Sequence, residues 1–185
     1  MLPNNMKYNK SQLGFTLIEL LVVISIIGVL SSIVLASVAN GRKKAHEGEI
    51  KSNLIQIRTA LELYYSANGS YPSTGGAWWT EGPANGSHPR TGPTGWIPNL
   101  APSYIPILPH DKYTGQDRTS IHAWCDSNST YYFYKSDGAN YKVEAWCLAE
   151  YFPIPSTSYF ADPWITSIGG YQINMTIYTP AARLW

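Results

Sequence analysis

The first third of the chain carries two successive helical patterns of apolar residues. From residue 15 to residue 38 apolar side chains occupy almost every position. A helix of that length spans about 36 Å, at about 1.5 Å per residue, and so can cross a hydrocarbon core of about 30 Å. From residue 39 to residue 67 the apolar positions recur at spacings of three and four. The members of this stripe are Ile50, Leu54, Ile57, Leu61 and Tyr65. The two patterns predict a transmembrane or assembly helix over 15–38 that continues as an amphipathic extension over 39–67.

The helix is expected to end at Asn68-Gly69, because glycine accepts the left-handed backbone of a helix stop and Pro72 follows. Residues 71–120 then combine many prolines and glycines with aromatic side chains, and are predicted to be irregular. The aromatic residues are Trp78, Trp79, Trp96, Tyr104 and Tyr113. They either pack this segment onto the domain or form an exposed contact surface.

A β-hairpin is predicted after this segment. Aromatic-rich strands at Tyr131–Lys135 and Tyr141–Cys147 flank Asp137-Gly138, a dipeptide typical of tight turns. If Asp137 and Gly138 form a two-residue turn, Cys147 lies opposite Asn128.

The last predicted strand covers residues 171–178. Its apolar residues Tyr171, Ile173, Met175 and Ile177 alternate with polar ones, which predicts a half-buried strand. A long helix followed by such strands indicates an α+β fold, in which a C-terminal antiparallel sheet packs on the helix. The globular domain is therefore expected to span residues 68–185.

Net charge argues against one class of partner. The chain has 13 basic and 12 acidic residues, a formal net charge of +1. The first 14 residues contribute Lys7 and Lys10 and no acidic residue. Without them the side-chain charge of residues 15–185 is −1. This part of the chain therefore has no excess of positive charge to bind nucleic acid, and a nucleic-acid partner is not expected.

The most informative stretch is Gly14-Phe15-Thr16-Leu17-Ile18-Glu19, at the start of the apolar run. An ionisable group inside a membrane-length helix costs roughly 2.5–3.5 kcal/mol on insertion scales and usually marks a functional position. Glu19 therefore needs a partner. The best candidate is an α-amine at Phe15, created by cleavage after Gly14.

This stretch resembles the N-terminal signal of type IV prepilins and type II secretion pseudopilins. The resemblance implies that 1–14 is a leader peptide, that a prepilin peptidase cuts between Gly14 and Phe15, and that the new Phe15 amine is methylated. It also implies that Glu19 serves filament assembly. The Phe15 amine of one subunit would pair with Glu19 of a neighbour displaced by about one helical turn, and so set the axial stagger. Alternatively, Glu19 is an acid that snorkels to the membrane surface.

Two other readings of the apolar run stay open. Ser37-Val38-Ala39 is a passable cleavage site for an ordinary secretory signal, although the run is too long for one and Glu19 would interrupt it. The run could also be an uncleaved single-pass anchor with no role in assembly.

Cys125 and Cys147 both fall in the exported part, and an even cysteine count outside the cytoplasm suggests one disulfide. The alternatives are buried free thiols, or zinc held with His110 and His122. Calcium is a weaker option, since the aspartates that could serve as ligands do not form a dense acidic pattern. These are Asp111, Asp117, Asp126 and Asp137.

No cofactor is expected, and no motif nominates a nucleophile or a base, so the chain is not expected to be an enzyme. The four histidines, including His46, read as loop or helix-surface residues.

The resemblance implies a structural subunit, pilin or pseudopilin, that is stored in the inner membrane with a single pass and its C-terminal domain outside. Its implied partners are copies of itself, other pilins, and a membrane platform protein with a cytoplasmic assembly ATPase. A minor subunit at a filament tip, binding DNA, a surface or a secreted substrate, is the second hypothesis. An exported domain on an N-terminal anchor, without a filament, is the third.

Overall fold

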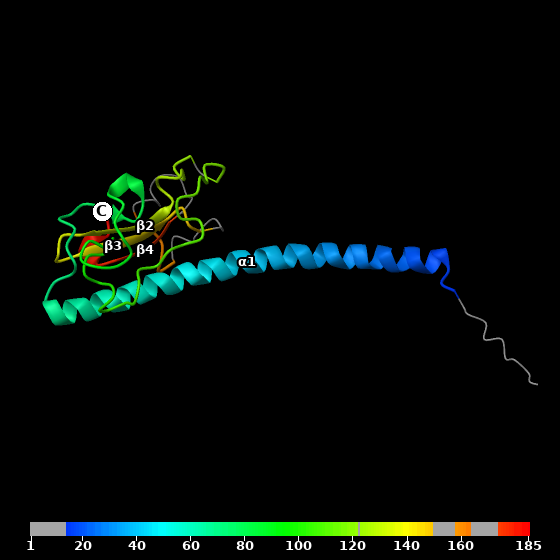
Figure 1. The fold of residues 1–185 in the computed structure, drawn as a ribbon, viewed down its shortest axis with the longest axis horizontal. Coiled ribbons are helices and arrows are strands. Elements are labelled where there is room, and N and C mark those ends of the chain that lie inside the picture. Colours follow the sequence, from blue (N-terminus) through cyan, green and yellow to red (C-terminus); the bar gives the residue numbers. More distant parts are fainter. Residues whose placement is uncertain (1–13, 122, 150–157, 164–173) are drawn as a thin grey trace, which may run out of the picture. The chain divides into compact units, whose positions relative to one another are not determined.

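The computed structural model describes residues 14–121, 123–149, 158–163 and 174–185. It contains two compact units, one ending at Gly41 and one beginning at Arg42. One long helix, α1 (Leu17–Asn68), runs from the first unit into the second, and a four-stranded antiparallel sheet follows (Figure 1). The predicted α+β class, with a long N-terminal helix and a C-terminal antiparallel sheet, is confirmed.

The end of α1 follows the stop signal in the sequence. Gly69 adopts a left-handed backbone, with φ of +72°. Its amide donates to the Tyr65 carbonyl at 2.8 Å, and the Asn68 side chain donates to the Tyr64 carbonyl at the same distance. Carbonyls of the last turn are therefore satisfied.

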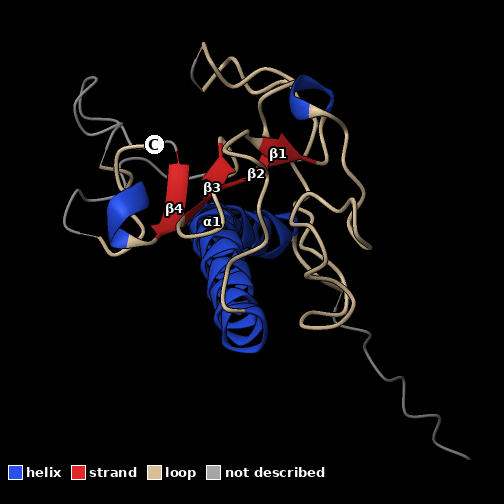
Figure 2. Ribbon diagram, turned by 90° about the vertical axis from the view of Figure 1, so that its left-hand side faces the viewer, coloured by secondary structure: helices blue, strands red, loops and turns tan. Residues whose placement is uncertain are grey.

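The sheet contains β1 (Trp79–Thr80), β2 (Tyr131–Ser136), β3 (Tyr141–Trp146) and β4 (Asn174–Tyr178) in sequence order. Two short 3-10 helices, η1 (Pro83–Asn85) and η3 (Pro180–Ala182), lie outside it. Figure 2 shows the strands side by side above α1.

The core of the second unit lies between α1 and one face of the sheet. Ile50, Leu54, Ile57 and Leu61 are completely buried there, as their spacing predicts. The sheet contributes Tyr132, Tyr134, Val143, Ala145, Met175 and Ile177 to the same cluster. Tyr65 is an exception, because it is 43% exposed and packs against Tyr71 with ring centroids 4.7 Å apart.

The hairpin turn is longer than the two-residue turn considered above. Ser136 pairs with Tyr141, so four residues separate the strands, and Tyr131 pairs with Trp146. The Asp137 carboxylate accepts hydrogen bonds from the amides of Ala139 and Asn140, at 2.9 and 2.7 Å. This side chain closes a wider loop than Asp-Gly alone would, and the expected pairing of Cys147 with Asn128 is wrong.

The last strand is buried on both faces. Met175 and Ile177 point into the core, as the alternation predicts, but Asn174 and Thr176 are also completely buried. Residues 158–163 run along the outer edge of β4, where Thr176 donates its amide to the Phe160 carbonyl at 2.9 Å and Ala161 pairs with Met175. The prediction of a half-buried strand is therefore wrong for 174–178, and Tyr171 and Ile173 lie outside the described residues.

The proline-rich segment is mostly irregular, as predicted, but it also supplies β1 at the sheet edge and η1. Trp96 is completely buried and stacks on Tyr132, with ring centroids 6.0 Å apart. Of the two readings of its aromatic residues, packing onto the domain is right for Trp96. Trp78 and Trp79 stay partly exposed.

Candidate functional site

The Gly14–Phe15 peptide bond lies in accessible backbone. Residues 14–16 precede the first turn of α1, and Phe15 is 85% exposed. A Cβ atom added at Gly14 would meet nothing within 4 Å. An exposed, uncrowded segment of this kind is one that a processing enzyme can bind.

Glu19 forms a capping box with Thr16. The amide and hydroxyl of Thr16 each donate to Glu19 Oε2 at 2.8 Å, and the Glu19 amide donates back to Thr16 Oγ1 at 3.3 Å. These bonds satisfy polar groups at the start of α1 that would otherwise lack partners. The sequence interpretation missed this role, although Thr-x-x-Glu before an apolar run is its known signature.

The capping box leaves half of the carboxylate unused. Both donors from Thr16 go to Oε2, and within the described residues no hydrogen bond reaches Oε1. The carboxylate is therefore held in one orientation and still has an acceptor to offer to another chain.

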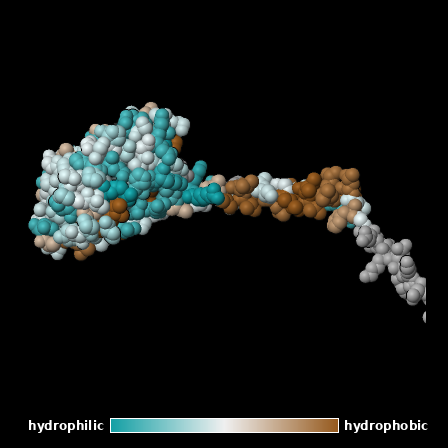
Figure 3. Space-filling model, in the orientation of Figure 1, coloured by the Kyte–Doolittle hydropathy of each residue, from teal (hydrophilic) through white to brown (hydrophobic). Residues whose placement is uncertain are grey.

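The surface around Glu19 is apolar on all sides of the helix. The large apolar side chains from Leu17 to Val38 are 44–80% exposed, and Figure 3 shows this stretch as mostly hydrophobic on the face in view. By length and composition α1 is a candidate membrane-spanning helix. The hydroxyls of Ser25 and Ser32 donate to carbonyls of the preceding turn, at 2.7 and 2.8 Å. Glu19 Oε1 is therefore the polar atom on this surface that most needs a hydrogen-bond or ion-pair partner.

A disulfide joins Cys125 to Cys147, with an S–S distance of 2.09 Å, and both cysteines are buried. It connects the loop before β2 to the residue just after β3. The predicted disulfide is confirmed, and neither thiol is available for zinc. Within the described part of the chain, no group of three or more His, Cys, Asp or Glu side chains is arranged to hold a metal ion. His122 lies outside that part.

His46 is buried, so the expectation that it is a helix-surface residue is wrong. His46 Nε2 lies 2.6 Å from Asp111 Oδ2, and both residues are less than 5% exposed. Tyr113 packs edge-on against the imidazole, with centroids 5.2 Å apart. This contact fastens the proline-rich segment to α1. The two partners are 65 positions apart in the sequence, which explains why no local pattern reveals the contact.

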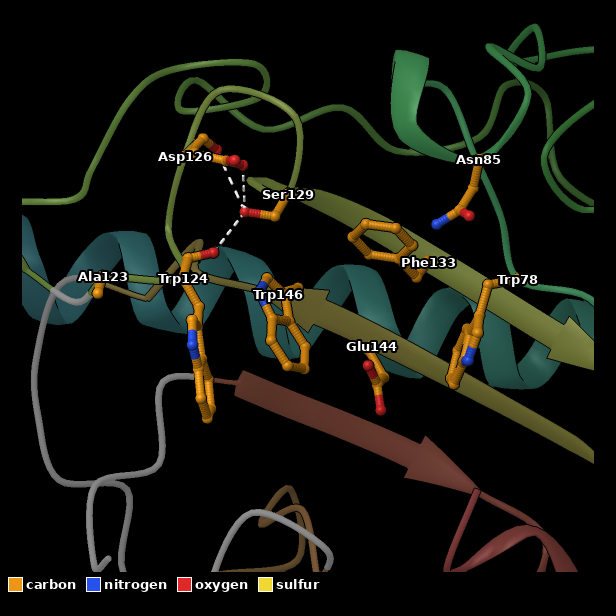
Figure 4. Close-up of a pocket in the computed structure, with 9 residues that line it drawn as sticks. All are labelled: Trp78, Asn85, Ala123, Trp124, Asp126, Ser129, Phe133, Glu144 and Trp146. Atoms are coloured by element: carbon orange, nitrogen blue, oxygen red, sulfur yellow. Dashed lines mark hydrogen bonds between the residues drawn. The ribbon is translucent and has the colours of Figure 1, made fainter. Parts of the chain in front are cut away.

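An aromatic pocket opens on the sheet face that is turned away from α1. Its walls are Trp78, Trp124, Trp146 and Phe133, and Asp126 and Glu144 are its acidic residues (Figure 4). Trp78 and Phe133 meet edge to face, with centroids 6.4 Å apart. Trp79, by contrast, stacks on His88 at 3.8 Å. Of the two neighbouring tryptophans, Trp78 therefore lines the pocket and Trp79 does not.

Comparison with known proteins supports the reading of the N-terminus. The signature described as the prokaryotic N-terminal methylation motif matches residues 9–35. The chain is 38% identical over 65 residues to a type II secretion system core protein G of Klebsiella michiganensis, covering 35% of this chain and 46% of that protein. It is 39% identical over 69 residues to the protein of the same name from Escherichia coli strain K12, covering 37% and 48%. The match in Klebsiella pneumoniae is 41% over 63 residues, covering 34% and 45%.

The chain thus spans about half the length of the curated relatives it matches. No solved structure matches it.

Proposed function

We propose that this chain, which carries the N-terminal methylation motif and resembles type II secretion pseudopilins, is a structural subunit of a type II secretion pseudopilus or a type IV pilus. The observation that carries the proposal is an apolar helix, exposed on all sides, whose first 24 residues after Gly14 contain one ionisable group, Glu19. Such a surface needs either lipid or other helices around it.

Processing comes first in this scheme. A prepilin peptidase removes residues 1–14 at the accessible Gly14–Phe15 bond and methylates the new amine of Phe15. Cleavage leaves the Thr16–Glu19 capping box intact, since both residues remain in the mature chain. The mature N-terminus therefore keeps an oriented carboxylate four residues from a positive charge.

Assembly then pairs these two groups between subunits. Four residues of helix separate the Phe15 amine from Glu19 by about 6 Å, so a neighbour displaced by about one turn brings its amine to Glu19 Oε1. In an apolar bundle each charge is costly without the other, and the pair is formed only at the correct stagger. A buried polar contact fixes register in coiled coils in the same way.

Before assembly, the subunit is proposed to reside in the inner membrane as a single-pass protein, with its disulfide-bonded domain on the non-cytoplasmic side. A platform protein and its cytoplasmic ATPase would extract it into the filament. There, helices of other copies and of other pilins replace lipid around residues 15–38.

Substitution of the cleavage-site glycine tests the proposal. We expect Gly14→Val protein to retain its leader, because a branched side chain beside the scissile bond hinders its binding in the peptidase site. The uncleaved protein should be absent from filaments sheared from cells that make the rest of the machinery. Immunoblots of the membrane and filament fractions measure this. Gly41→Val is the matched control, since a Cβ atom there also meets nothing within 4 Å. If Gly14→Val enters filaments as well as Gly41→Val does, the proposal is wrong.

The aromatic pocket favours a second candidate, a minor subunit that binds a target at the filament tip. Three tryptophans around one opening provide a large contact area at low cost in side-chain entropy. Immunogold labelling separates the candidates: label along the whole filament supports a structural subunit, and label confined to the tip supports the binding module. A chain that is exported but never reaches a filament would instead support the anchored domain.

A further inference from the structure

A buried cluster of one amine and two carboxyl groups lies on the outer face of the sheet. Lys142 Nζ is 2.9 Å from Glu144 Oε1 and 3.1 and 3.3 Å from the two Asp162 oxygens. The Lys142 and Asp162 side chains are completely buried, and that of Glu144 is 7% exposed. The main-chain oxygen of Trp185 also accepts from Lys142, at 2.7 Å.

The sheet topology brings these three residues together. Lys142 and Glu144 are two positions apart on β3, so they point to the same face. Asp162 reaches that face because Ala161 pairs with Met175 on the neighbouring strand β4. Aromatic residues Trp78, Phe133 and Trp146 surround the exposed side of Glu144 and limit access of water.

The three groups are not all charged at neutral pH. Burial raises the pKa of the Glu144 carboxyl to about 8, Lys142 opposes this rise, and Asp162 adds to it. Glu144 therefore holds a proton that it can donate. Lys142 Nζ and the Asp162 carboxyl group lie within 3.3 Å of each other with both side chains completely buried, so the two groups are held together away from water.

We propose that Lys142 and Asp162 condense to form an amide cross-link, and that Glu144 moves the protons. Lys142 first passes a proton to an Asp162 oxygen, which lies within hydrogen-bond distance, and its nitrogen lone pair then attacks Cγ of Asp162. Glu144 donates its proton to the departing oxygen and takes one from the nitrogen. The Nζ–Cγ bond forms, one Cγ–O bond breaks, and that oxygen leaves as water. An ammonium and a carboxylate are thereby converted to an amide and one water molecule, and Glu144 ends with the proton it started with. No oxidant or other reactant is needed.

Two physical effects favour the reaction. Groups held in contact react with effective concentrations of about 10⁵–10⁸ M. Condensation also releases one water molecule, and the burial of Lys142 and Asp162 limits the return of water to the new amide. The product ties β3 to the segment that pairs with β4 through Ala161. The cross-link lies near the start of β3, whereas the disulfide at Cys147 follows its end.

Mass spectrometry of the exported protein tests this directly. After reduction of the disulfide, we expect a mass lower by one water than the mature sequence with its N-terminal methyl group requires. Trypsin cuts after a free lysine but not after an acylated one, and the chain has no lysine or arginine between Lys142 and Arg183. The cross-linked protein should therefore yield one fragment covering 136–183. Full recovery of a free 136–142 peptide, with no loss of water, would overturn the proposal.

Three variants assign the roles. Glu144→Gln keeps the shape of the neutral side chain but removes the acidic proton, and we expect condensation to slow about 100-fold or more. Asp162→Ala should abolish the loss of water, whereas Lys135→Arg, which alters the lysine paired with Lys142 across β2 and β3, should preserve it. Loss of water that persists in Asp162→Ala, or an undiminished reaction rate in Glu144→Gln, contradicts the assignment.

Discussion

Glu19→Gln protein is expected to be cleaved and inserted in the membrane but absent from filaments. The cleavage site is unchanged, and insertion becomes easier without a carboxylate. Glutamine also serves at this position of a capping box, so Thr16 keeps its partner and α1 starts normally. Only the charge that pairs with the neighbour's Phe15 amine is lost, and leaving one member of a buried ion pair unpartnered costs about 3–5 kcal/mol.

Immunoblots of sheared filaments and of the membrane fraction measure this outcome. Ser25→Ala is the matched control, since its hydroxyl bonds only the helix backbone and its loss should not affect assembly. If Glu19→Gln protein enters filaments as well as Ser25→Ala protein does, Glu19 is an acid that snorkels to the membrane surface and the stagger mechanism is wrong.

Trp96→Ala is expected to destabilise the globular domain by about 3–5 kcal/mol, because it leaves a large cavity in the core. Trp96 is completely buried and stacked on Tyr132, in the core cluster that also contains Leu54. Denaturant unfolding of the detergent-solubilised mature chain, followed by circular dichroism, measures the loss.

Trp78→Ala is the matched comparison. Trp78 is partly exposed at the pocket, so its loss should cost much less stability and should lower target binding or secretion if the pocket is a contact surface. Equal destabilisation by the two substitutions would show that the pocket wall is part of the core.

The elements that could be predicted are those set by neighbouring residues. Their patterns repeat within a few residues, as in the apolar run, the stripe from Ile50 to Leu61 and the aromatic strands. The helix, its stop and the hairpin could therefore be predicted from local sequence. The turn length did not follow, because the Asp137 side chain captures two amides and widens the loop.

Contacts between segments that are far apart in the sequence could not be predicted from the sequence. The His46–Asp111 pair and the cluster of Lys142, Glu144 and Asp162 join residues that only the folded topology brings together. The alternation of residues in β4 predicted one exposed face, because nothing local shows that Asn174 and Thr176 are completely buried in the fold.

The candidate assembly site differs from these cases, because its residues are contiguous. Gly14, Phe15 and Glu19 could be nominated from one short stretch, and the Thr16 partner of Glu19 was visible in the same stretch. The orientation of the Glu19 carboxylate, with Oε2 occupied, required the structure.

The mass of the N-terminal tryptic peptide of the mature protein tests the central proposal most directly. With no lysine or arginine between them, that peptide should run from Phe15 to Arg42. We predict a peptide that begins at Phe15 and carries one added methyl group on its amine. A peptide that still contains leader residues, or a mature chain that begins at Asn40 after a secretory-type cut, would contradict the account.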